Sequence, residues 1–499
     1  MFSLLVPPPV RASLLQMASA APPSPSSSSH PQPSSPQLFS PPSSILIIGS
    51  GIFGLGTAWA LARRDIFAQC TITVVDRSDP ADPGAFPAPD AASVDTSRIV
   101  RADYADPAYA ALGAEAQVQW RKQARPTDLG AQGRYHESGL VLVADPGPAR
   151  VPGEIVAKSD MRGMDYVRSS WANVLSLASY NPDLASSIHE LRDTAAIRER
   201  LGTGGSSGSW GYINQGSGWA DAAASTNWLF NRVKETGRVT FVSGTVSSLK
   251  HSGTRVTGAW LSDGRVLTAE LVVLAAGAWT GGLVDLSGQA TATGQVLGYL
   301  DLTEAEQEKL GDMPVILNLT SGLFIIPPRN RILKVARHAY GYLNPTLPET
   351  TQLPSASSSP PNQPISYPIT YLSDPALSIP QEGADDLRQA LREMVPGLAE
   401  RPFTKTRLCW YSDTPTGDFL VTYHPRYDGL FLATGDSGHG FKFMPVIGDK
   451  VVDCIVHNCP PDFIKRWGWK PDTQRVVTED GSRGGQPGLI LANELGNAN

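Results

Sequence analysis

The stretch ILIIGSGIFG at residues 45–54 decides the fold. Its first four residues indicate a short buried strand, the next six carry the spacing Gly-x-Gly-x-x-Gly, and an apolar helical run continues to Leu61. This order of strand, tight turn and helix is typical of dinucleotide-binding sites, because the glycines let the backbone approach a pyrophosphate at the helix N-terminus. The expected turn consists of Gly49, Ser50, Gly51, Ile52, Phe53 and Gly54.

A second predicted strand supports this interpretation. The run TITVVD at residues 71–76 ends in Asp76, which follows the turn at the distance expected of an acidic residue that binds a ribose diol. The alternative is a membrane span, because residues 45–62 carry no charge. The glycines at the turn spacing, and Arg63-Arg64 directly after the run, favour the dinucleotide turn.

The run LVVLAAGAW at residues 271–279 favours a flavin dinucleotide over a nicotinamide dinucleotide. In flavoproteins a buried strand that closes on small residues returns the chain to the nucleotide site; an ordinary parallel strand is the alternative. Before this run lies a meander, which we expect to form an antiparallel excursion from the parallel sheet. Its strands are expected at residues 239–242, 244–249, 256–261 and 266–271.

Six motifs follow one another along the chain. They are the Gly-rich turn, SRIVR (97–101), SGWADA (217–222), LKVARH (333–338), CWY (409–411) and SGHGFKF (437–443). Over residues 44–468 their order resembles the monomeric sarcosine oxidase and fructosyl amino acid oxidase family, and fungal fructosyl amine, saccharopine and pipecolate oxidases in particular. The resemblance implies a D-amino-acid-oxidase-like α/β fold, in which an FAD-binding doubly wound parallel sheet is interleaved with an α+β substrate domain that has a large mixed sheet.

The resemblance also implies a discontinuous domain organisation. Residues 45–110, 215–290 and 405–468 are expected to form the FAD-binding domain, and residues 111–214 and 291–404 the substrate domain. Residues 1–44 contain no acidic residue and are rich in Ser and Pro, so they are expected to be disordered, with Met17 as an alternative start. Residues 469–499 are expected to form a polar tail.

Cys409 is the expected attachment point of the flavin. It is one of four cysteines, and their spacing fits neither a disulfide framework nor a metal site. The resemblance implies FAD held covalently through an 8α-S-cysteinyl link to Cys409. Burial as an inert small side chain is the alternative.

The motif at residues 437–443 follows a predicted strand at 430–434 and precedes an apolar helical run at 444–456. The positive end of that helix is suited to stabilise negative charge on a reduced flavin. His439 and Lys442 are three positions apart, so on a helical turn both are expected to face the flavin and the substrate. The resemblance implies that Lys442 binds the substrate carboxylate, whereas a solvated lysine is the alternative.

Arg98 and Arg101 are expected to share one helical face or turn edge. The resemblance implies that Arg101 clamps the substrate carboxylate, because its guanidinium can bind two oxygens at once. It places Arg98 beside the flavin ring; surface salt bridges are the alternative for both. Ser93 and Val94 stand where bacterial sarcosine oxidases carry a histidine pair, so sarcosine itself is a less favoured substrate.

Lys334 alternates with Leu333 and Val335, so a strand would turn it to the opposite face. The resemblance implies that Lys334 activates oxygen, since a fixed cation stabilises the developing negative charge. It also implies that His338 lies near the substrate and that Tyr411 walls the pocket.

The predicted site residues fall into three groups. The catalytic group is Lys334, Arg98, His439, His338 and Tyr411, and the substrate-binding group is Arg101, Lys442 and Tyr411. Besides the turn, the cofactor-binding group contains Asp76, Arg77, Ser97, Arg98, Val246, Ala276, Gly277, Trp279, Cys409, Asp436, Gly438, Gly440, Phe441 and Lys442.

These features predict an FAD-dependent oxidase of a secondary amine or N-substituted amino acid. Hydride would pass from the carbon next to nitrogen to flavin N5, oxygen would be reduced to hydrogen peroxide, and an imine would form. The alternative enzyme is a tailoring oxidase of secondary metabolism, in which the oxidised amine is trapped within the molecule to close a ring. A flavin-binding protein without turnover is disfavoured by the joint presence of Arg101, Lys334, Cys409 and Lys442, and a nicotinamide dehydrogenase by the lack of a second dinucleotide motif.

Composition limits the kinds of molecule that this protein is expected to bind. Of the 499 residues, 41% are hydrophobic, enough for the cores of two domains, and a net charge of -6 gives no basic footprint for nucleic acid. We expect a monomer that acts on a small-molecule amine and oxygen, without a metal, a nucleic acid or a membrane. Residues 497–499 are not a peroxisomal Ser-Lys-Leu signal, which favours a cytoplasmic location. Loops at residues 351–367 and 202–211 are expected to be flexible and to rim the pocket.

Overall fold

The computed structural model describes residues 39–79, 81–82, 86–147, 160–179, 182–286, 288–347, 364–470 and 478–496. Several predictions lie outside these residues: the disorder of residues 1–38, the loop at 351–363, and the parts of the tail at 471–477 and 497–499. The elements that position the site all belong to the compact unit Pro41–Asn499.

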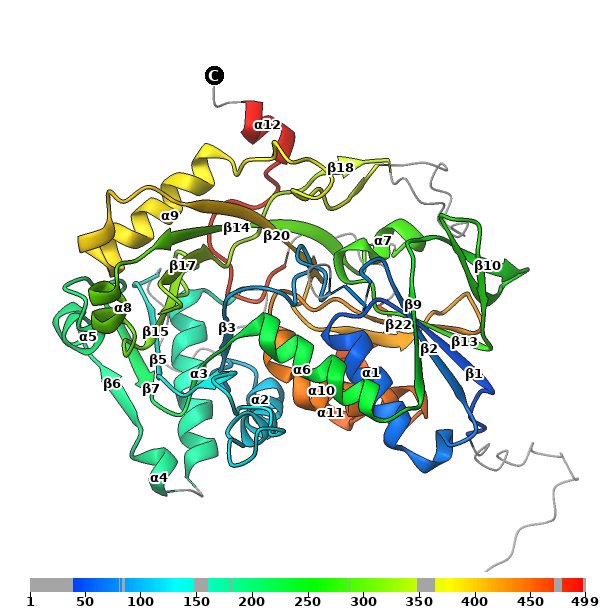
Figure 1. Ribbon diagram of the computed structural model, residues 1–499. Helices are drawn as coiled ribbons and strands as arrows, with labels where there is room; N and C mark the ends of the chain where they lie inside the picture. The colour runs from blue at the N-terminus through cyan, green and yellow to red at the C-terminus, as the bar shows by residue number, and fades with distance from the viewer. Residues whose placement is uncertain are drawn as a thin grey trace, which may run out of the picture. The chain divides into compact units, whose positions relative to one another are not determined.

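A six-stranded sheet carries the glycine turn (Figure 1). Its order is β21 (Leu420–Tyr423), β22 (Leu430–Thr434), β13 (Leu271–Leu274), β1 (Ser44–Ile48), β2 (Thr71–Asp76) and β9 (Val239–Ser243). β21 pairs antiparallel with β22, and every other neighbouring pair is parallel. β9 is the first strand of the predicted meander, and its expected antiparallel pairing was wrong because it extends the parallel sheet beside β2.

Both faces of this sheet are covered, which explains its continuous apolar strands. On one face lie α1 (Ile52–Arg63), α6 (Ala222–Glu235) and α10 (Met444–Ile455), as Figure 1 shows. α1 and α10 come very close, since a Cβ on Gly448 would lie 2.0 Å from the carbonyl oxygen of Gly56. On the other face, β10 (Val246–Ser252), β11 (Arg255–Leu261) and β12 (Val266–Thr268) form the antiparallel remainder of the meander and share an apolar cluster with the sheet.

The uncharged run at residues 45–62 therefore divides into a strand, a turn and a helix. Among the helices of the described residues, none is long and apolar enough to cross a membrane. The expected order of strand, turn and helix is confirmed.

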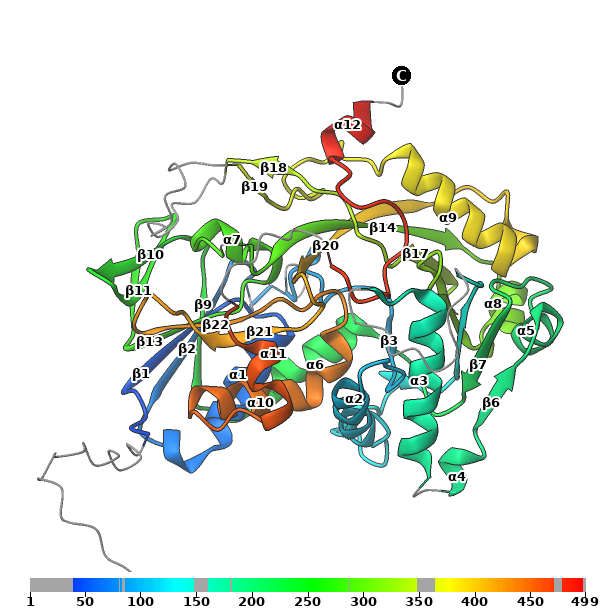
Figure 2. The ribbon, with the colours of Figure 1, turned by 180° about the vertical axis from the view of Figure 1, so that it is seen from behind.

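A second, eight-stranded sheet is mixed. Its order is β20 (Lys405–Asp413), β14 (Thr291–Asp301), β17 (Ile332–Arg337), β16 (Leu323–Arg329), β15 (Val315–Asn318), β5 (Leu140–Ala144), β7 (Trp210–Asn214) and β6 (Ile188–Leu191). α9 (Gln381–Met394) packs on β14, β16 and β17 (Figure 2). Leu333 and Val335 point into the core beneath α9, so Lys334 faces away from it, as the alternation predicted.

The two sheets draw on interleaved parts of the chain. The strands of the six-stranded sheet fall in the ranges expected for the FAD-binding domain, apart from Ser44, which begins β1 although residues 1–44 were expected to be disordered. The eight-stranded sheet uses the ranges expected for the substrate domain, except for β20, which pairs with β14 along its whole length. The domain boundaries themselves stay a prediction.

Arg98 lies on a strand rather than on a helix. β3 (Arg98–Val100) pairs with β8 (Gly218–Ala220), which also pairs with β4 (Tyr135–His136). In extended backbone, residues three positions apart point to opposite faces. The prediction that Arg98 and Arg101 share one helical face was therefore wrong.

The other described elements connect and flank these sheets. The helices are α2 (Pro107–Trp120), α3 (Gly163–Ala178), α4 (Pro182–Ala185), α5 (Thr194–Leu201), α7 (Thr280–Leu283), α8 (Glu304–Leu310), α11 (Pro461–Trp467) and α12 (Leu491–Gly496), with short 3-10 turns at Asp65–Phe67, Gly277–Trp279, Pro396–Leu398 and Phe441–Phe443. A two-stranded ribbon pairs β18 (Pro345–Thr346) with β19 (Ile365–Ser366).

Candidate functional site

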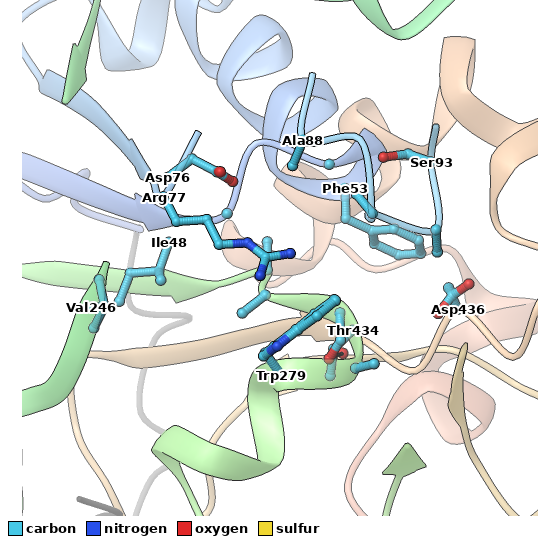
Figure 3. Close-up of a pocket in the computed structure, with 18 of the residues that line it drawn as sticks. Ile48, Phe53, Asp76, Arg77, Ala88, Ser93, Val246, Trp279, Thr434 and Asp436 are labelled. Carbon is cyan, nitrogen blue, oxygen red and sulfur yellow. Dashed lines mark hydrogen bonds between the residues drawn. The ribbon is translucent and has the colours of Figure 1, made fainter. Parts of the chain in front are cut away.

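A cavity of about 1210 Å³, including its open mouth, lies at the carboxyl ends of the parallel strands (Figure 3). Ligands of open α/β sheets bind at this edge. We call it the dinucleotide cavity. The predicted residues that line it are Gly49, Gly51, Ile52, Phe53, Asp76, Arg77, Val246, Ala276, Gly277, Trp279, Asp436 and Phe441, and residues that the sequence did not single out include Ala88, Ser93, Thr245, Trp410 and Thr434.

The glycine turn has a backbone that other residues would disrupt. Gly49 has φ of 107°, and a Cβ on it would lie 2.4 Å from the carbonyl oxygen of Ala275. A Cβ on Gly54 would lie 1.9 Å from the Gly49 oxygen, so this glycine lets α1 pack onto the turn. Asp76 accepts a hydrogen bond from the Ser50 amide at 2.7 Å, which ties the end of β2 to the turn.

Arg77 and Trp279 project toward each other across the dinucleotide cavity (Figure 3). The guanidinium carbon of Arg77 lies 4.3 Å from the centroid of the indole, and the same guanidinium pairs with Asp90 at 2.6 Å. Trp279 follows the small residues after β13, so this segment returns to the nucleotide site as predicted. A fixed cation and a flat ring next to Asp76 suit the phosphate, base and ribose of a nucleotide.

A buried charge cluster surrounds Lys334. Its ammonium lies 2.6 Å from a carboxylate oxygen of Asp95 and donates to the Ser97 carbonyl at 2.8 Å. Arg98 pairs with the same carboxylate at 3.0 Å, and the Tyr299 hydroxyl donates to it at 2.7 Å. Sequence reasoning missed Asp95, although its position three residues before Arg98 was a usable signal.

The opposite charges in this cluster stabilise each other's ionised forms. Burial opposes ionisation of Asp95, but the nearby charges of Lys334 and Arg98 outweigh it and hold the pKa of the carboxyl well below its usual range. Burial lowers the pKa of Lys334 to about 8, although Asp95 opposes the shift. Asp95 thus keeps a cation inside the protein.

Cys409 borders the same cluster. Its side chain is completely buried in β20, and Arg98 Nη2 lies 3.3 Å from its sulfur. The next residue, Trp410, lines the dinucleotide cavity. Arg98, Cys409 and Lys334 are therefore brought together by three strands that are distant in sequence, β3, β20 and β17.

A second cavity, of about 730 Å³ with its mouth, lies beside Arg101. It is lined by Arg101, Tyr104, Asp106, Tyr109, Met161, Tyr166, His338, Gly417, His439, Asp480 and Ser482, among others. Arg101 is buried with its guanidinium 4.6 Å from the Tyr104 ring centroid, and its Nη1 has no hydrogen-bond partner in the described part of the chain. A buried guanidinium nitrogen without a partner is unusual and suits an anionic ligand.

The segment at residues 202–209 does not border this cavity. Ser206 donates its amide to the Glu393 carbonyl at 2.6 Å, and the Ser207 hydroxyl donates to the Glu393 carboxylate at 2.7 Å. This segment is thus anchored to the end of α9 and continues into β7. The prediction that residues 202–211 rim the pocket was wrong, because the linings of both cavities come from other segments.

Lys442 and Arg101 both lie near the ring of Tyr104. Its Nζ lies 5.5 Å from the Tyr104 centroid and donates to the His439 carbonyl at 3.0 Å. Burial, and next the charge of Arg101, hold the pKa of Lys442 well below its ordinary value. Two cations that are far apart in sequence thus meet beside the second cavity.

The SGHGFKF motif borders both cavities, because Phe441 lines the dinucleotide cavity and His439 lines the second cavity. His439 Nε2 donates to the Gly417 carbonyl at 2.7 Å, so Nδ1 accepts from the Tyr104 hydroxyl at 3.0 Å. Burial, followed by the charge of Lys442, holds its pKa well below the ordinary value. His439 is thus a neutral wall residue whose two ring nitrogens are both bound.

His338 and Tyr411 lie side by side, with ring centroids 6.1 Å apart. Gly438 has φ of 67°, and a Cβ on it would lie 2.2 Å from the Tyr411 ring, so this glycine admits the tyrosine. His338 Nε2 is 3.2 Å from the hydroxyl of Ser482. The C-terminal segment thus reaches the site, which nothing in its sequence indicated.

A family profile described as FAD dependent oxidoreductase matches residues 44–454. The chain belongs to this family. It is 34% identical over 459 residues to the amino acid oxidase imqH of Aspergillus flavus, covering 84% of this chain and 93% of that protein. It is 28% identical over 445 residues to the L-saccharopine oxidase of Schizosaccharomyces pombe, covering 86% of this chain and 93% of that protein. A modified fructosyl peptide oxidase from Aspergillus nidulans superposes with a TM-score of 0.73 and 26% identity, covering 91% of this chain and 99% of that chain.

The FAD-dependent oxidoreductase family confirms the predicted fold class and the enzyme class. The dinucleotide cavity fits FAD on its own geometry: the Gly49 and Gly54 backbones leave no room for a side chain, α1 begins at the turn, and Asp76 closes β2 at the rim. The cavity extends to Asp436 and Phe441 of the SGHGFKF region, next to the second cavity. A flavin held there would have its ring end near the cations of the site.

Proposed function

We propose that this FAD-dependent oxidoreductase oxidises a secondary amine or N-substituted amino acid. The observation that carries the proposal is the meeting of Arg101 and Lys442 at Tyr104, beside a cavity that Arg101 lines, together with the lack of a hydrogen-bond partner for Arg101 Nη1 among the described residues. Among the described residues neither side chain forms an ion pair, although Asp103 acts on Arg101 and Asp436 on Lys442, so both suit a substrate carboxylate. FAD bound in the neighbouring cavity would supply the acceptor for a hydride from the carbon next to nitrogen and would then be reoxidised by oxygen to give hydrogen peroxide.

Arg101 and Lys442 would orient the substrate. A guanidinium binds two carboxylate oxygens in a fixed geometry, and an ammonium adds a third charge-assisted hydrogen bond. The pKa of Lys442 is lowered by burial and by Arg101, so a bound carboxylate would favour its protonated form. His338 and Tyr411 would wall the pocket, and neutral His439 would keep Tyr104 in place.

Lys334 would act on the oxygen side of the reaction. Its ammonium is buried and held by Asp95, so it needs no rearrangement to stabilise negative charge on oxygen as oxygen is reduced. Arg98 shares this carboxylate and would lie beside the flavin.

Cys409 would hold FAD through an 8α-S-cysteinyl thioether. The thiolate is the nucleophilic form of cysteine. Arg98 Nη2 lies 3.3 Å from the sulfur and would help to position it during attachment.

A peroxide-coupled screen with mass analysis of products tests the proposal. The panel contains N-methyl amino acids, fructosyl amino acids, saccharopine, pipecolate and N-methylated aromatic amino acids. An aldehyde with released amine would support simple oxidation, and a product two hydrogens lighter than the substrate would support ring closure on the same site. Flavin reduction by none of these compounds under anaerobic conditions would overturn the proposal.

A further inference from the structure

The C-terminal segment at residues 478–483 contributes Asp480 and Ser482 to the lining of the second cavity. Arg483 is buried, pairs with Asp413 at 2.7 Å and donates to the Ser437 carbonyl at 2.8 Å. The Thr478 hydroxyl donates to the Thr414 carbonyl at 2.9 Å. These contacts tie the segment to β20 and to the SGHGFKF motif, so its side chains occupy defined positions.

Asp480 belongs to this segment and lines the second cavity, and one of its two carboxylate oxygens is available to a ligand. Its Oδ1 accepts hydrogen bonds from the Ser482 amide at 3.0 Å and the Ser482 hydroxyl at 2.7 Å. Its Oδ2 lies beside Gly417, where a Cβ would come within 2.8 Å of it, and has no hydrogen-bond or ion-pair partner among the described residues. Asp106 also lines the cavity, but it pairs with Arg466 and caps α2. Asp480 is therefore the carboxylate of the two with capacity for a ligand.

The lining of the second cavity thus contains two opposite charges, Arg101 and Asp480, together with the aromatic rings of Tyr104 and Tyr166. Arg101 and Asp480 both act on the Tyr166 hydroxyl: burial raises its pKa, Arg101 opposes that shift and Asp480 adds to it. Burial also raises the pKa of the Tyr104 hydroxyl; Arg101 opposes that shift and Asp480 adds to it. The rings suit the apolar part of a ligand, Arg101 suits an anion, and Asp480 suits a hydrogen-bond donor.

We propose that Asp480 determines specificity by binding a hydroxyl or ammonium group at the end of the substrate opposite its carboxylate. This inference rests on the proposed function, because it takes the carboxylate to be held by Arg101 and Lys442. The substrate class is then an N-substituted amino acid whose side chain ends in a hydrogen-bond donor. Asp480 is half-buried, and a site that pairs a donor with such an acceptor discriminates against the analogue without the donor, since that hydrogen bond is then lost.

Matched substrate pairs test this inference. N-methyltyrosine and N-methylphenylalanine differ by a terminal hydroxyl, and Nα-methyllysine and N-methylnorleucine differ by a terminal ammonium. The protein is compared with Asp480→Asn, which keeps an oxygen acceptor but removes the charge, and with Asp480→Ala, which removes both. Glu479→Gln is the control, because it removes an adjacent charge that does not line the cavity.

In at least one pair, the unsubstituted protein should prefer the donor-bearing compound by about tenfold or more in kcat/KM. Asp480→Ala should abolish that preference, and Glu479→Gln should keep it. Asp480→Asn should abolish preference for the ammonium but retain part of the preference for the hydroxyl. An equal loss on both members of each pair, or no change in any ratio, would overturn the role of Asp480.

A binding measurement separates this inference from the proposed function. 3-Phenylpropanoate and 3-(4-hydroxyphenyl)propanoate carry the carboxylate but no oxidisable amine, and 6-aminohexanoate and hexanoate form the corresponding ammonium pair. Calorimetric affinities should show a donor preference that Asp480→Ala removes. Oxidation of the N-methyl compounds without any donor preference would leave the proposed function standing and reject the role of Asp480. Absence of oxidation, together with a donor preference that Asp480→Ala removes, would reject the function and leave the binding site standing.

Discussion

The Lys334 ammonium lies 2.6 Å from a carboxylate oxygen of Asp95, and side-chain exposure is 1% for both residues. Arg98 pairs with the same carboxylate, so one anion serves two cations inside the protein. Removing one partner of a buried ion pair leaves an uncompensated charge, which is more costly than the pair itself is favourable. Asp95 is therefore expected to matter both for folding and for the charge on Lys334.

Asp95→Asn should lower the free energy of unfolding by about 3–5 kcal/mol, the usual cost of breaking a buried pair. The same change should depress the pKa of Lys334 further, because the opposing carboxylate is gone. Thermal or denaturant unfolding measures the first effect. Asp263→Asn, in an exposed pair with Arg265, is the matched control and should change stability far less.

Lys334→Met should slow reoxidation of the reduced flavin by orders of magnitude, because the cation that stabilises reduced oxygen is lost. Anaerobic reduction of the flavin by substrate should stay nearly unchanged. Stopped-flow absorbance separates the two half-reactions, and Lys334→Arg tests whether a cation alone suffices. Equal slowing of both half-reactions would remove Lys334 from this role.

The oxygen half-reaction should depend on pH through Lys334. Its pKa is about 8, so the ammonium is present below that pH and is lost as the pH rises through it. The rate of reoxidation should therefore fall as the pH rises through about 8. The same step should be missing in Lys334→Met, and a rate that increases with pH in this range would contradict the assignment.

Cys409→Ala should release FAD on acid precipitation, whereas the unchanged protein should stay yellow. A flavin mass on the peptide that contains Cys409 would identify the link directly. Cys454→Ala is the control, because that cysteine lies on α10, away from the strand β20 that carries Cys409 and brings Trp410 to the dinucleotide cavity. Free flavin in the supernatant of the unchanged protein would show that the attachment is noncovalent.

Arg101→Gln and Lys442→Ala should each lower kcat/KM by about one to two orders of magnitude, since a charge-assisted hydrogen bond contributes roughly 1.5–3 kcal/mol. The loss should be much smaller for the amide of the same substrate, which has no full negative charge. Steady-state kinetics on the acid and its amide measure both. Equal losses on the two compounds would show that the cations tune the flavin instead of holding a carboxylate.

Local patterns predicted the dinucleotide site well. The turn at residues 49–54 could be predicted because its backbone has positions without room for a Cβ. Only glycine fits there, and the spacing of the glycines is visible in the sequence. The orientation of Lys334, whose side chain points to the opposite face of the strand from Leu333 and Val335, followed from strand alternation. The backbone around Arg98 was predicted incorrectly, because a spacing of three fits a helical face but here occurs in extended chain.

Contacts between residues that are distant in sequence could not be predicted from such local patterns. The chain has 47 Asp and Glu residues; the spacing of Asp95 and Arg98 points to a pair between those two, but nothing local links Asp95 to Lys334. The parallel pairing of β9 likewise depends on which sheet edge is free, a property of the packed molecule. Anchoring of residues 202–209 on α9 depends on the same kind of distant contact.

The sequence by itself determined the strand–turn–helix of the dinucleotide site and the presence of two basic motifs, because backbone sterics and side-chain periodicity act between near neighbours. Only the tertiary structure brought Arg101 and Lys442 to one tyrosine ring, paired Asp95 with Lys334 and placed Asp480 in the same cavity as Arg101. These relationships join segments from both ends of the chain. They arise because burying the two sheets forces distant charged groups into shared, water-poor space, where each must find a partner or a ligand.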